Sequence, residues 1–370
     1  MKVLYIAGRE EAYSRTRIII SALEKRGHDV VTCLPPDRRF RHYPRLAWQA
    51  LRRADDCDVV LVGFYGQFLV PLVRAVTRKP IVFDTYVTTY DTMVLDRGKA
   101  RAGTIKAWFY GLPDRVAYRL ADISILDSQT VIDHFGRLFN VKTDRMRRLF
   151  LAVDDGVIHP QQDQSEESAS KPTPDHPLIV HFHGEFTPFH GVSTIIRAAA
   201  RLKDRPVVFQ IVGRGITYEA DRALAESLGV DNIRFIDTVP YAELAGLMTG
   251  ADICLGIFGD NPRAELVITN KVIEALGMRK PLITRTTGPA EELLEDGKNA
   301  RLVPPADSQA LAEAIIELGD RPHLRDHLAA AGYTTFLGHS TTERLGAGLE
   351  EILAEAMKAH GVSAREGMEN

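Results

Sequence analysis

Short apolar runs alternate with amphipathic stretches along the first 130 residues of the chain. The opening segments KVLYIAG, YSRTRIIISALEKRG and HDVVTC have the pattern of a strand, a helix and a strand. Three more apolar runs, typical of buried parallel strands, follow at 58–63, 80–86 and 121–127, with helical stretches between them. The pattern predicts a doubly wound α/β domain over residues 1–160.

The alternation stops at residues 161–176, which lack apolar periodicity and are rich in Gln, Ser, Asp and Pro. This composition predicts a linker. A second α/β domain is then expected over 177–340, because apolar runs return at 177–184, 206–213, 233–237, 251–259, 281–286 and 302–305. Residues 341–358 predict an amphipathic helix that packs back towards the first domain, and 359–370 a disordered tail.

The composition adds a cellular setting to this two-domain picture. A chain of 370 residues, 45% hydrophobic and 26% charged, is long enough for two cores. Cys33, Cys57 and Cys254 each lie in an apolar run, which is typical of reduced thiols in a cytoplasmic protein. The N-terminal apolar run is too short for a signal peptide, and 59–73 is interrupted by Gly and Pro, so we expect no membrane span.

Residues 269–284, TNKVIEALGMRKPLIT, predict a short helix that begins at the carboxyl edge of the second sheet. Asn270, Lys271 and Glu274 share one face of it. The free N–H groups of a helix N-terminus suit a phosphate, which Lys271 and Arg263 would also attract. Glu274 suits a vicinal diol such as a ribose. The segment therefore fits a nucleotide diphosphate, although an exposed Lys271–Glu274 ion pair explains it equally well.

Glycines follow two further strands of the second domain. In VGRG, residues Val212, Gly213 and Gly215 would let the backbone approach a ligand, although this is not a full dinucleotide fingerprint and a plain turn explains it as well. Thr287 and Gly288 follow PLITR at the same sheet edge, where backbone N–H groups would face phosphates. A turn that caps the next helix is the alternative there.

The first domain offers its own candidates at the carboxyl edge of its sheet. Gly8 follows the first strand, and Arg15 opens the next helix, where it would meet the acceptor or a donor phosphate. Asp84, Tyr90 and Asp91 lie in IVFDTYVTTYDT, and none of them is assigned a catalytic role.

Charge is unevenly shared between the halves of the chain. Residues 1–155 carry 26 Lys and Arg against 18 Asp and Glu, whereas the whole chain has a net charge of −3. Six arginines between 38 and 53 are interleaved with Phe40, Tyr43 and Trp48, and 145–150 hold a second basic cluster. These segments predict weak binding to an anionic membrane; arginine stems that cover apolar seams are the alternative. No nucleic-acid module is present, so nucleic acid is not an expected partner.

Four segments carry a resemblance to a known family: SALEKRGHDVVTC, HGEFTPFHGVSTIIRAA, IVGRG and NKVIEALGMRKPLITRTTGPAEELLEDGKNARLVPPAD. In order and spacing they resemble the nucleotide-sugar-dependent glycosyltransferases of the GT-B fold, family 4. The resemblance implies two Rossmann-like doubly wound domains facing a cleft, with the donor held by the second. It implies transfer of a sugar from a nucleotide diphosphate to a glycan, lipid-linked or small-molecule acceptor, with retention and with no metal or other cofactor. The location it suggests is cytoplasmic, or peripheral on the inner face of the membrane.

The resemblance also assigns residues. Glu274 stands where the second glutamate of the family's E-x7-E motif binds the ribose, and Lys271 and Arg263 complete the catalytic candidates. The first glutamate of the motif is replaced by Leu266, with Glu265 adjacent to it.

The family usually offers an arginine and a lysine to the diphosphate after the first strand of the second lobe. Glu185 and His190 occupy those places here, and with Gly184 and Gly191 they are the donor-binding candidates in that loop. Two other readings stay open: a sugar-nucleotide epimerase of the same fold, and a non-catalytic protein that binds nucleotide sugars.

Overall fold

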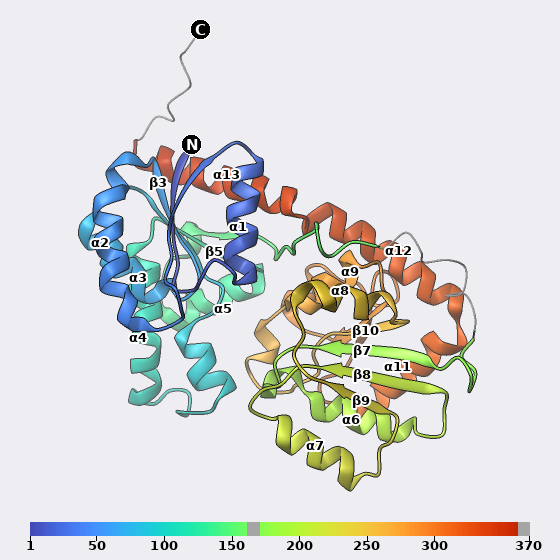
Figure 1. The fold of residues 1–370 in the computed structure, drawn as a ribbon. Helices are drawn as coiled ribbons and strands as arrows, with labels where there is room; N and C mark the ends of the chain where they lie inside the picture. The colour runs from blue at the N-terminus through green and yellow to red at the C-terminus, as the bar shows by residue number, and fades with distance from the viewer. Residues whose placement is uncertain (161–170, 362–370) are drawn as a thin grey trace. The chain divides into compact units, whose positions relative to one another are not determined.

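The computed structural model describes residues 1–160 and 171–361. Most of the predicted linker and of the predicted tail therefore lies outside the described residues. The chain divides into two compact units (Figure 1): Met1–Ala152 together with the chain from Thr341 onward, and Val153–Ser340. Each unit is built on one six-stranded parallel sheet.

The sheet of the first unit has the order β2-β1-β3-β4-β5-β6, so the strand order reverses between β1 and β3. Its strands are β1 (Lys2–Ile6), β2 (Asp29–Cys33), β3 (Val59–Val62), β4 (Ile81–Asp84), β5 (Ile123–Leu126) and β6 (Met146–Arg148). The helices between them are α1 (Ser14–Lys25), α2 (Tyr43–Arg53), α3 (Leu69–Val76), α4 (Ile105–Leu120) and α5 (Gln129–Phe139). The β6 strand was not predicted, because it lies in a segment that the sequence presents as a basic cluster.

The last helix, α13 (Thr342–Ala359), belongs to the core of the first unit, as predicted. Leu345, Leu349 and Leu353 are buried together with apolar residues of α1, β1 and β3. Gly346 allows the close approach, since a Cβ there would come within 2.7 Å of the carbonyl oxygen of Ala22 on α1. The first core is therefore assembled from both ends of the chain.

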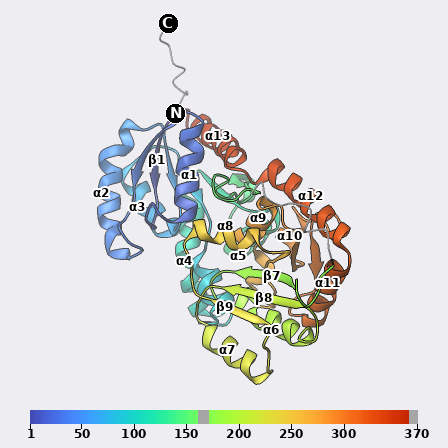
Figure 2. The same cartoon turned by 45° about the vertical axis from the view of Figure 1, so that its right-hand side comes forward.

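The sheet of the second unit has the order β12-β11-β10-β7-β8-β9, which is the Rossmann order with its reversal between β7 and β10. Its strands are β7 (Leu178–His183), β8 (Val207–Val212), β9 (Ile233–Ile236), β10 (Ile253–Leu255), β11 (Leu282–Arg285) and β12 (Arg301–Val303). Its helices are α6 (Val192–Arg201), α7 (Tyr218–Ser227), α8 (Tyr241–Thr249), α9 (Asn270–Gly277), α10 (Gly288–Glu291), α11 (Ser308–Asp320) and α12 (Pro322–His339). Helices cover both faces of this sheet, with α6 and α11 on one face and α9 and α12 on the other (Figures 1 and 2).

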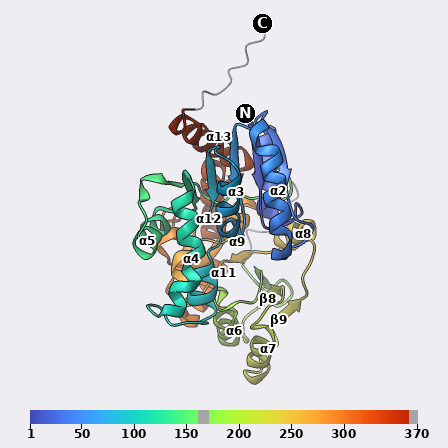
Figure 3. The ribbon, with the colours of Figure 1, turned by 90° about the vertical axis from the view of Figure 1, so that its left-hand side faces the viewer.

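Both units thus have the doubly wound α/β fold that the sequence predicts, with α2, α3 and α4 as consecutive neighbours in the first (Figure 3). The three cysteines are buried free thiols, as expected from their apolar surroundings. Burial raises the pKa of Cys254 to about 12, which makes this thiol inert at neutral pH. Within the described part of the chain, no helix is long and apolar enough to cross a bilayer.

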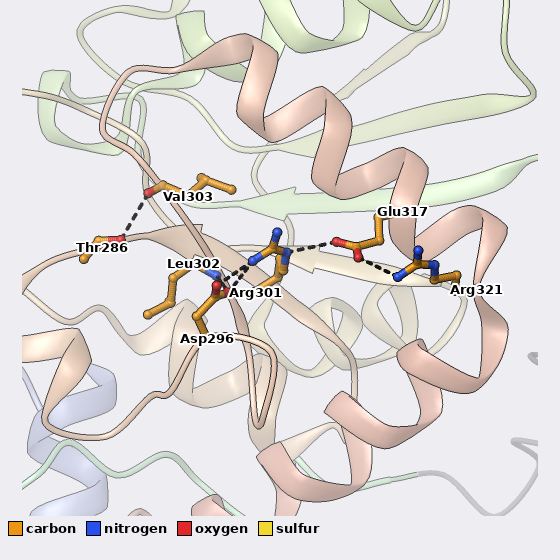
Figure 4. Close-up of polar contacts among 7 residues, drawn as sticks. All are labelled: Thr286, Asp296, Arg301, Leu302, Val303, Glu317 and Arg321. Carbon is orange, nitrogen blue, oxygen red and sulfur yellow. Dashed lines mark hydrogen bonds and ion pairs between the residues drawn. The ribbon is translucent and has the colours of Figure 1, made fainter.

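Edge strand β12 is fastened by a network of charges (Figure 4). Arg301 donates to both carboxylate oxygens of Asp296, at 2.7 and 2.6 Å, and to Glu317 of α11 at 3.1 Å. Glu317 also accepts from Arg321 at 3.0 Å, and Asp296 accepts from the backbone N–H of Leu302 at 2.8 Å. The network ties the edge of the sheet to the helix that follows it.

Candidate functional site

The candidate donor site lies where β7, β8 and β10 of the second unit reach their carboxyl ends. Helix α9 begins at Asn270 after the loop that follows β10, so its N-terminus points to the place where the strand order reverses. No side chain caps this end of α9. Its first backbone N–H groups and the positive end of its dipole are therefore available to an anion.

Lys271 is a buried lysine at this helix end, with only 5% of its surface exposed. Its Nζ lies 3.0 Å from Nε2 of His190 and 5.1 Å from the ring centroid of Phe182. Burial lowers the pKa of Lys271 to about 7, while the negative charge of Glu274 acts in the opposite direction. At neutral pH this amine is therefore present in both its neutral and its charged form.

His190 supports Lys271 instead of acting as a second cation. Its Nδ1 hydrogen-bonds to the carbonyl oxygen of Glu185, so Nε2 is left to accept from Lys271. Burial, together with the charges of Lys271 and Arg263, holds the pKa of His190 well below its usual value. A neutral imidazole therefore occupies this position, and a donor-binding role for His190 stays a prediction.

Glu274 ends a chain of buried hydrogen bonds that starts on the sheet. Its Oε2 lies 2.7 Å from Nε2 of His183, whose Nδ1 lies 3.0 Å from Nε2 of His181. Nε2 of Gln210 lies 3.4 Å from Nδ1 of His181. One proton arrangement satisfies all three contacts: each neutral group donates towards an ionised Glu274 carboxylate. The chain holds Oε2 of Glu274 in place.

The alternative reading of Lys271 and Glu274 as an exposed ion pair does not survive. Both side chains are buried, and each has its own histidine partner. A buried lysine and a buried glutamate on a helix end require specific partners to offset the loss of hydration. The two histidines supply those partners and hold both groups in place.

Glycines form the floor next to these groups. Gly184 has φ +144°, and a Cβ there would meet Cε and Nζ of Lys271 at 3.0 Å. Gly213 has φ +125° and lies against the carbonyl group of Gly184, too close for a side chain. A hollow of about 310 Å³ opens beside them, near the lower limit for small-molecule sites. Its lining consists of His183, Gly184, Glu185, Val212, Gly213, Arg214, Thr238, Val239 and Leu244.

Other predicted donor residues have structural roles. Gly191, with φ +66°, abuts the backbone of Gly259, and Gly215 abuts that of Phe186. The hydroxyl of Thr287 accepts from the N–H of Ala290 at 3.0 Å, so it caps α10, whose first residue is Gly288. For Thr287 and Gly288 the structure thus displays the capping turn that was the alternative to phosphate binding.

Arg263 and Glu265 lie in the loop between β10 and α9. The guanidinium of Arg263 lies 5.0 Å from the ring centroid of Phe189. Glu265 is bound by Arg285, a fully buried residue at the end of β11 that also donates to the carbonyl oxygen of Gly259. Arg285 therefore fixes the acidic residue next to Leu266, at the site edge, which makes Glu265 a second carboxylate candidate for a sugar hydroxyl.

In the first unit, Arg15 and Asp84 form a buried ion pair. The guanidinium donates through Nε at 3.1 Å and through Nη2 at 2.7 Å, a bidentate arrangement. Burial alone would lower the pKa of Arg15, but the carboxylate of Asp84 raises it above its ordinary value. The two side chains neutralise one another across 69 residues of sequence. An acceptor role for either residue stays a prediction.

Gly8, Tyr90 and Asp91 are also tied into the fold. Gly8 is packed against Phe64 and Tyr43, so close packing accounts for this glycine without a ligand. The N–H of Tyr90 donates to buried Asp114 at 2.9 Å, and burial raises the pKa of this carboxyl to about 8. Asp91 opens a π-helical segment, Asp91–Asp96, and its N–H donates to the hydroxyl of Thr88 at 3.0 Å. Asp114 thus positions the loop that presents Tyr90 and Asp91.

Three residues that position groups of the candidate site were missed from the sequence: His181, His183 and Arg285. The two histidines alternate in the strand HFH, and alternate residues of a strand share one face, which was an available signal. Their partner Glu274 lies 91 residues after His183. Only the fold brings them together.

Part of the chain is similar to known glycosyltransferases. Residues 177–321 match the family described as Glycosyl transferases group 1. The chain is 27% identical over 216 residues to the D-inositol 3-phosphate glycosyltransferase of Corynebacterium glutamicum (strain R), which covers 55% of this chain and 50% of that protein. It is also 27% identical over 223 residues to the alpha-D-kanosaminyltransferase of Streptomyces kanamyceticus, covering 58% and 56%. The chain spans about half the length of these curated relatives.

Solved structures share the fold over nearly the whole chain. The Anabaena protein HepE, in complex with UDP and glucose, matches with a TM-score of 0.72 and 17% identity, covering 96% of this chain and 99% of that chain. A sucrose-phosphate synthase from Thermosynechococcus elongatus matches with a TM-score of 0.76 and 15% identity, covering 97% and 100%.

Proposed function

We propose that the whole protein is a glycosyltransferase, because residues 177–321 match the family described as Glycosyl transferases group 1 and the chain has the predicted GT-B fold. The single observation that carries the proposal is the buried Lys271 at the uncapped N-terminus of α9, beside the ordered carboxylate of Glu274. A cation, a helix end and an acceptor group fit a diphosphate and a ribose together.

Sugar transfer requires stabilisation of the negative charge on the departing diphosphate. Breaking the bond between the anomeric carbon and the phosphate builds positive charge on the sugar and negative charge on the diphosphate. We propose that this negative charge develops next to Lys271 and the α9 N–H groups, which would then stabilise the transition state more than the ground state. We propose Arg263 as a third contributor, and transfer of a hexosyl group with retention and without a metal, in line with the family resemblance.

Glu274 is proposed to bind the ribose through its second oxygen, since Oε2 is held by His183. The adjoining hollow between Gly213 and Leu244 would take the rest of the nucleoside. Glu185 lines that hollow. A carboxylate would repel a phosphate but can accept a hydrogen bond from a sugar hydroxyl, so we propose that contact for Glu185. A glycan, a lipid-linked molecule or a small molecule is the proposed acceptor.

The function can be tested with a thermal-shift screen against UDP, GDP, ADP and their sugars. A ligand at 100 times its dissociation constant should add about 2.7 kcal/mol to the free energy of unfolding. UDP is the first candidate, because HepE is a structural neighbour described in complex with UDP. Stabilisation by none of these compounds would contradict donor binding.

Turnover separates a transferase from the other readings. A transferase should release nucleoside diphosphate only when an acceptor is added. Conversion of the nucleotide sugar without an acceptor would indicate an epimerase, whereas binding without turnover on any acceptor would indicate a nucleotide-sugar-binding protein. The relatives compared above are named as transferases, and they give the epimerase reading no support.

Donor affinity should depend on pH through Lys271. Because the pKa of this amine is about 7, it is mostly cationic below pH 7 and mostly neutral above it. A bound diphosphate raises the pKa again, so binding takes up a proton at alkaline pH. We expect the affinity for a nucleotide sugar to be constant below pH 7 and to fall by up to about tenfold per pH unit above it.

Isothermal titration calorimetry between pH 6 and pH 9 would measure this, with the variant Lys271→Met as the control. The variant should bind more weakly and show no such slope. The pKa of His190 is shifted to lower pH, so this residue does not titrate in the same window. A wild-type affinity that stays level from pH 7 to pH 9 would contradict the role of Lys271.

Cytoplasmic location and peripheral membrane association remain proposals. The arginines around α2 have mixed environments: Arg52 stacks over Trp48 at 4.4 Å, and Arg53 donates to the carbonyl oxygen of Thr32 at 2.9 Å. Arg147 pairs with Glu355 of α13. We propose that the exposed aromatic residues Phe40 and Trp48, rather than the 145–148 cluster, support contact of this segment with an anionic surface.

A further inference from the structure

Three large apolar side chains are exposed at the N-terminal end of α4. Ile105, Trp108 and Phe109 have 78%, 47% and 61% of their surface exposed. Ile105 precedes the other two by three and four positions, so all three lie on one side of the helix. The rings of Trp108 and Phe109 are 5.2 Å apart. Soluble proteins seldom expose such side chains as neighbours, and a patch of this kind marks an interaction surface.

The opposite side of α4 explains why this patch faces outward. Ala107, Gly111 and Asp114 are buried, and a Cβ on Gly111 would lie 3.2 Å from atoms of Phe139 and Tyr90. The hydroxyl of Thr104 accepts from the N–H of Ala107 at 3.3 Å, which fixes the start of the helix. The core therefore sets the orientation of α4 and makes no use of the apolar patch.

Basic residues predominate in the segment that carries the patch, which lies between Asp96 and Asp114. Residues 97–113 include Arg97, Lys99, Arg101 and Lys106 and contain no Asp or Glu. Within residues 1–160 and 171–361, none of these four basic residues takes part in an ion pair. A surface that is anionic and partly apolar would offset these positive charges and cover the exposed aromatic rings.

The patch is part of a wider trend in the first unit. Of the ten large hydrophobic residues exposed in the described chain, seven lie between positions 40 and 109. They are Phe40, Trp48, Leu51, Leu72, Ile105, Trp108 and Phe109. These residues lie on or next to α2, α3 and α4. In the fold α2 contacts α3, and α3 contacts α4 (Figure 3).

We propose that residues 97–109 dock on an anionic lipid bilayer. The side chains of Ile105, Trp108 and Phe109 enter the headgroup region, while the four basic side chains contact lipid phosphates. A second copy of the chain or another protein would also cover apolar side chains. Neither explains the four unpaired positive charges as directly as an anionic surface does. This inference is independent of sugar transfer and concerns a segment other than the arginine-rich one at α2.

The chain has two tryptophans, Trp48 and Trp108, and this permits a direct measurement. In the variant Trp48→Phe, all tryptophan emission comes from Trp108. With vesicles of phosphatidylcholine and phosphatidylglycerol at low salt, the emission should shift to shorter wavelength and be quenched by lipids brominated in their acyl chains. Vesicles of phosphatidylcholine alone, or high salt, should largely abolish the change.

Variants separate the apolar from the ionic contribution. In the Trp48→Phe background, Ile105→Ser with Phe109→Ser should weaken vesicle binding about tenfold or more, and Arg101→Gln with Lys106→Gln should weaken it about tenfold and reduce its salt dependence. The control is Leu337→Ser, which changes an apolar residue of α12 that is 47% exposed and should leave binding unchanged. Circular dichroism and the thermal unfolding midpoint without ligand verify that each variant is folded.

Several results would overturn the proposal. One is no change of Trp108 emission with phosphatidylglycerol vesicles at low salt. A second is an apolar double variant that binds vesicles like the wild type. A third is an emission change confined to Trp48 in the reciprocal Trp108→Phe variant, which would assign the contact to α2. A fourth is a parent protein that self-associates in sedimentation velocity but binds no vesicles, together with an apolar double variant that no longer self-associates. This result would assign the patch to contact with a second copy. A failed donor thermal shift would contradict the proposed function and leave this test unaffected.

Discussion

Lys271→Ala should slow sugar transfer by about two to three orders of magnitude, because loss of one donor to a developing anion typically costs about 2.7 to 4 kcal/mol of barrier. Lys271 is the buried amine at the uncapped end of α9. Its removal also leaves Nε2 of His190 without the donor that lies 3.0 Å away. Initial rates at saturating donor and acceptor would measure the effect on kcat, and rates at low donor the effect on kcat/KM.

Lys280→Ala is a suitable control, since Lys280 is a second buried lysine of the same unit. Its Nζ donates to the carbonyl oxygen of Thr249 at 2.7 Å, and within residues 1–160 and 171–361 it forms no hydrogen bond or ion pair with His190 or Glu274. This variant should lose some stability and retain its rate. A Lys271→Ala enzyme with near wild-type kcat, or a Lys280→Ala enzyme that is folded but equally slow, would refute the assignment.

Asp84→Ala should destabilise the first unit by about 3 to 5 kcal/mol, because it leaves Arg15 charged and buried without its counterion. The pair is bidentate, and both side chains are almost fully buried. Urea unfolding followed by tryptophan emission would isolate the effect, since Trp48 and Trp108 both belong to this unit. A destabilisation below about 1 kcal/mol would contradict the buried pair.

The double variant Arg15→Met with Asp84→Leu distinguishes a structural from a functional pair. Replacement of both partners by apolar residues should recover most of the lost stability. If the pair is purely structural, transfer activity should return together with stability. If stability returns and activity does not, Arg15 or Asp84 contacts the acceptor, as predicted from the position of Arg15 at the sheet edge.

The strand pattern was readable because most strands are buried on both faces and appear as continuous apolar runs. β6 was not predicted, because Met146 is its only buried residue and two arginines follow it. Helices α11 and α12 were not predicted. In α12 the buried positions are interrupted by small and polar residues without a clear apolar stripe, so periodicity gave no signal.

The candidate site was predictable only in part. The local pattern correctly placed Lys271 and Glu274 on one short helix. It could not reveal that both are buried, since their partners His190 and His183 belong to a distant segment. For the same reason Arg15 and Asp84 were noted separately, although each is the partner of the other.

The packing of α13 on α1 has a consequence for how the protein is made. The first unit begins with β1 but needs Leu345, Leu349 and Leu353 to close its core. During synthesis it therefore waits, with apolar surface on α1 uncovered, until the whole second unit has emerged. The second unit can complete its fold before the first unit does. We therefore expect the first unit to need chaperones most during the time in which α1 is exposed and α13 has not yet been made.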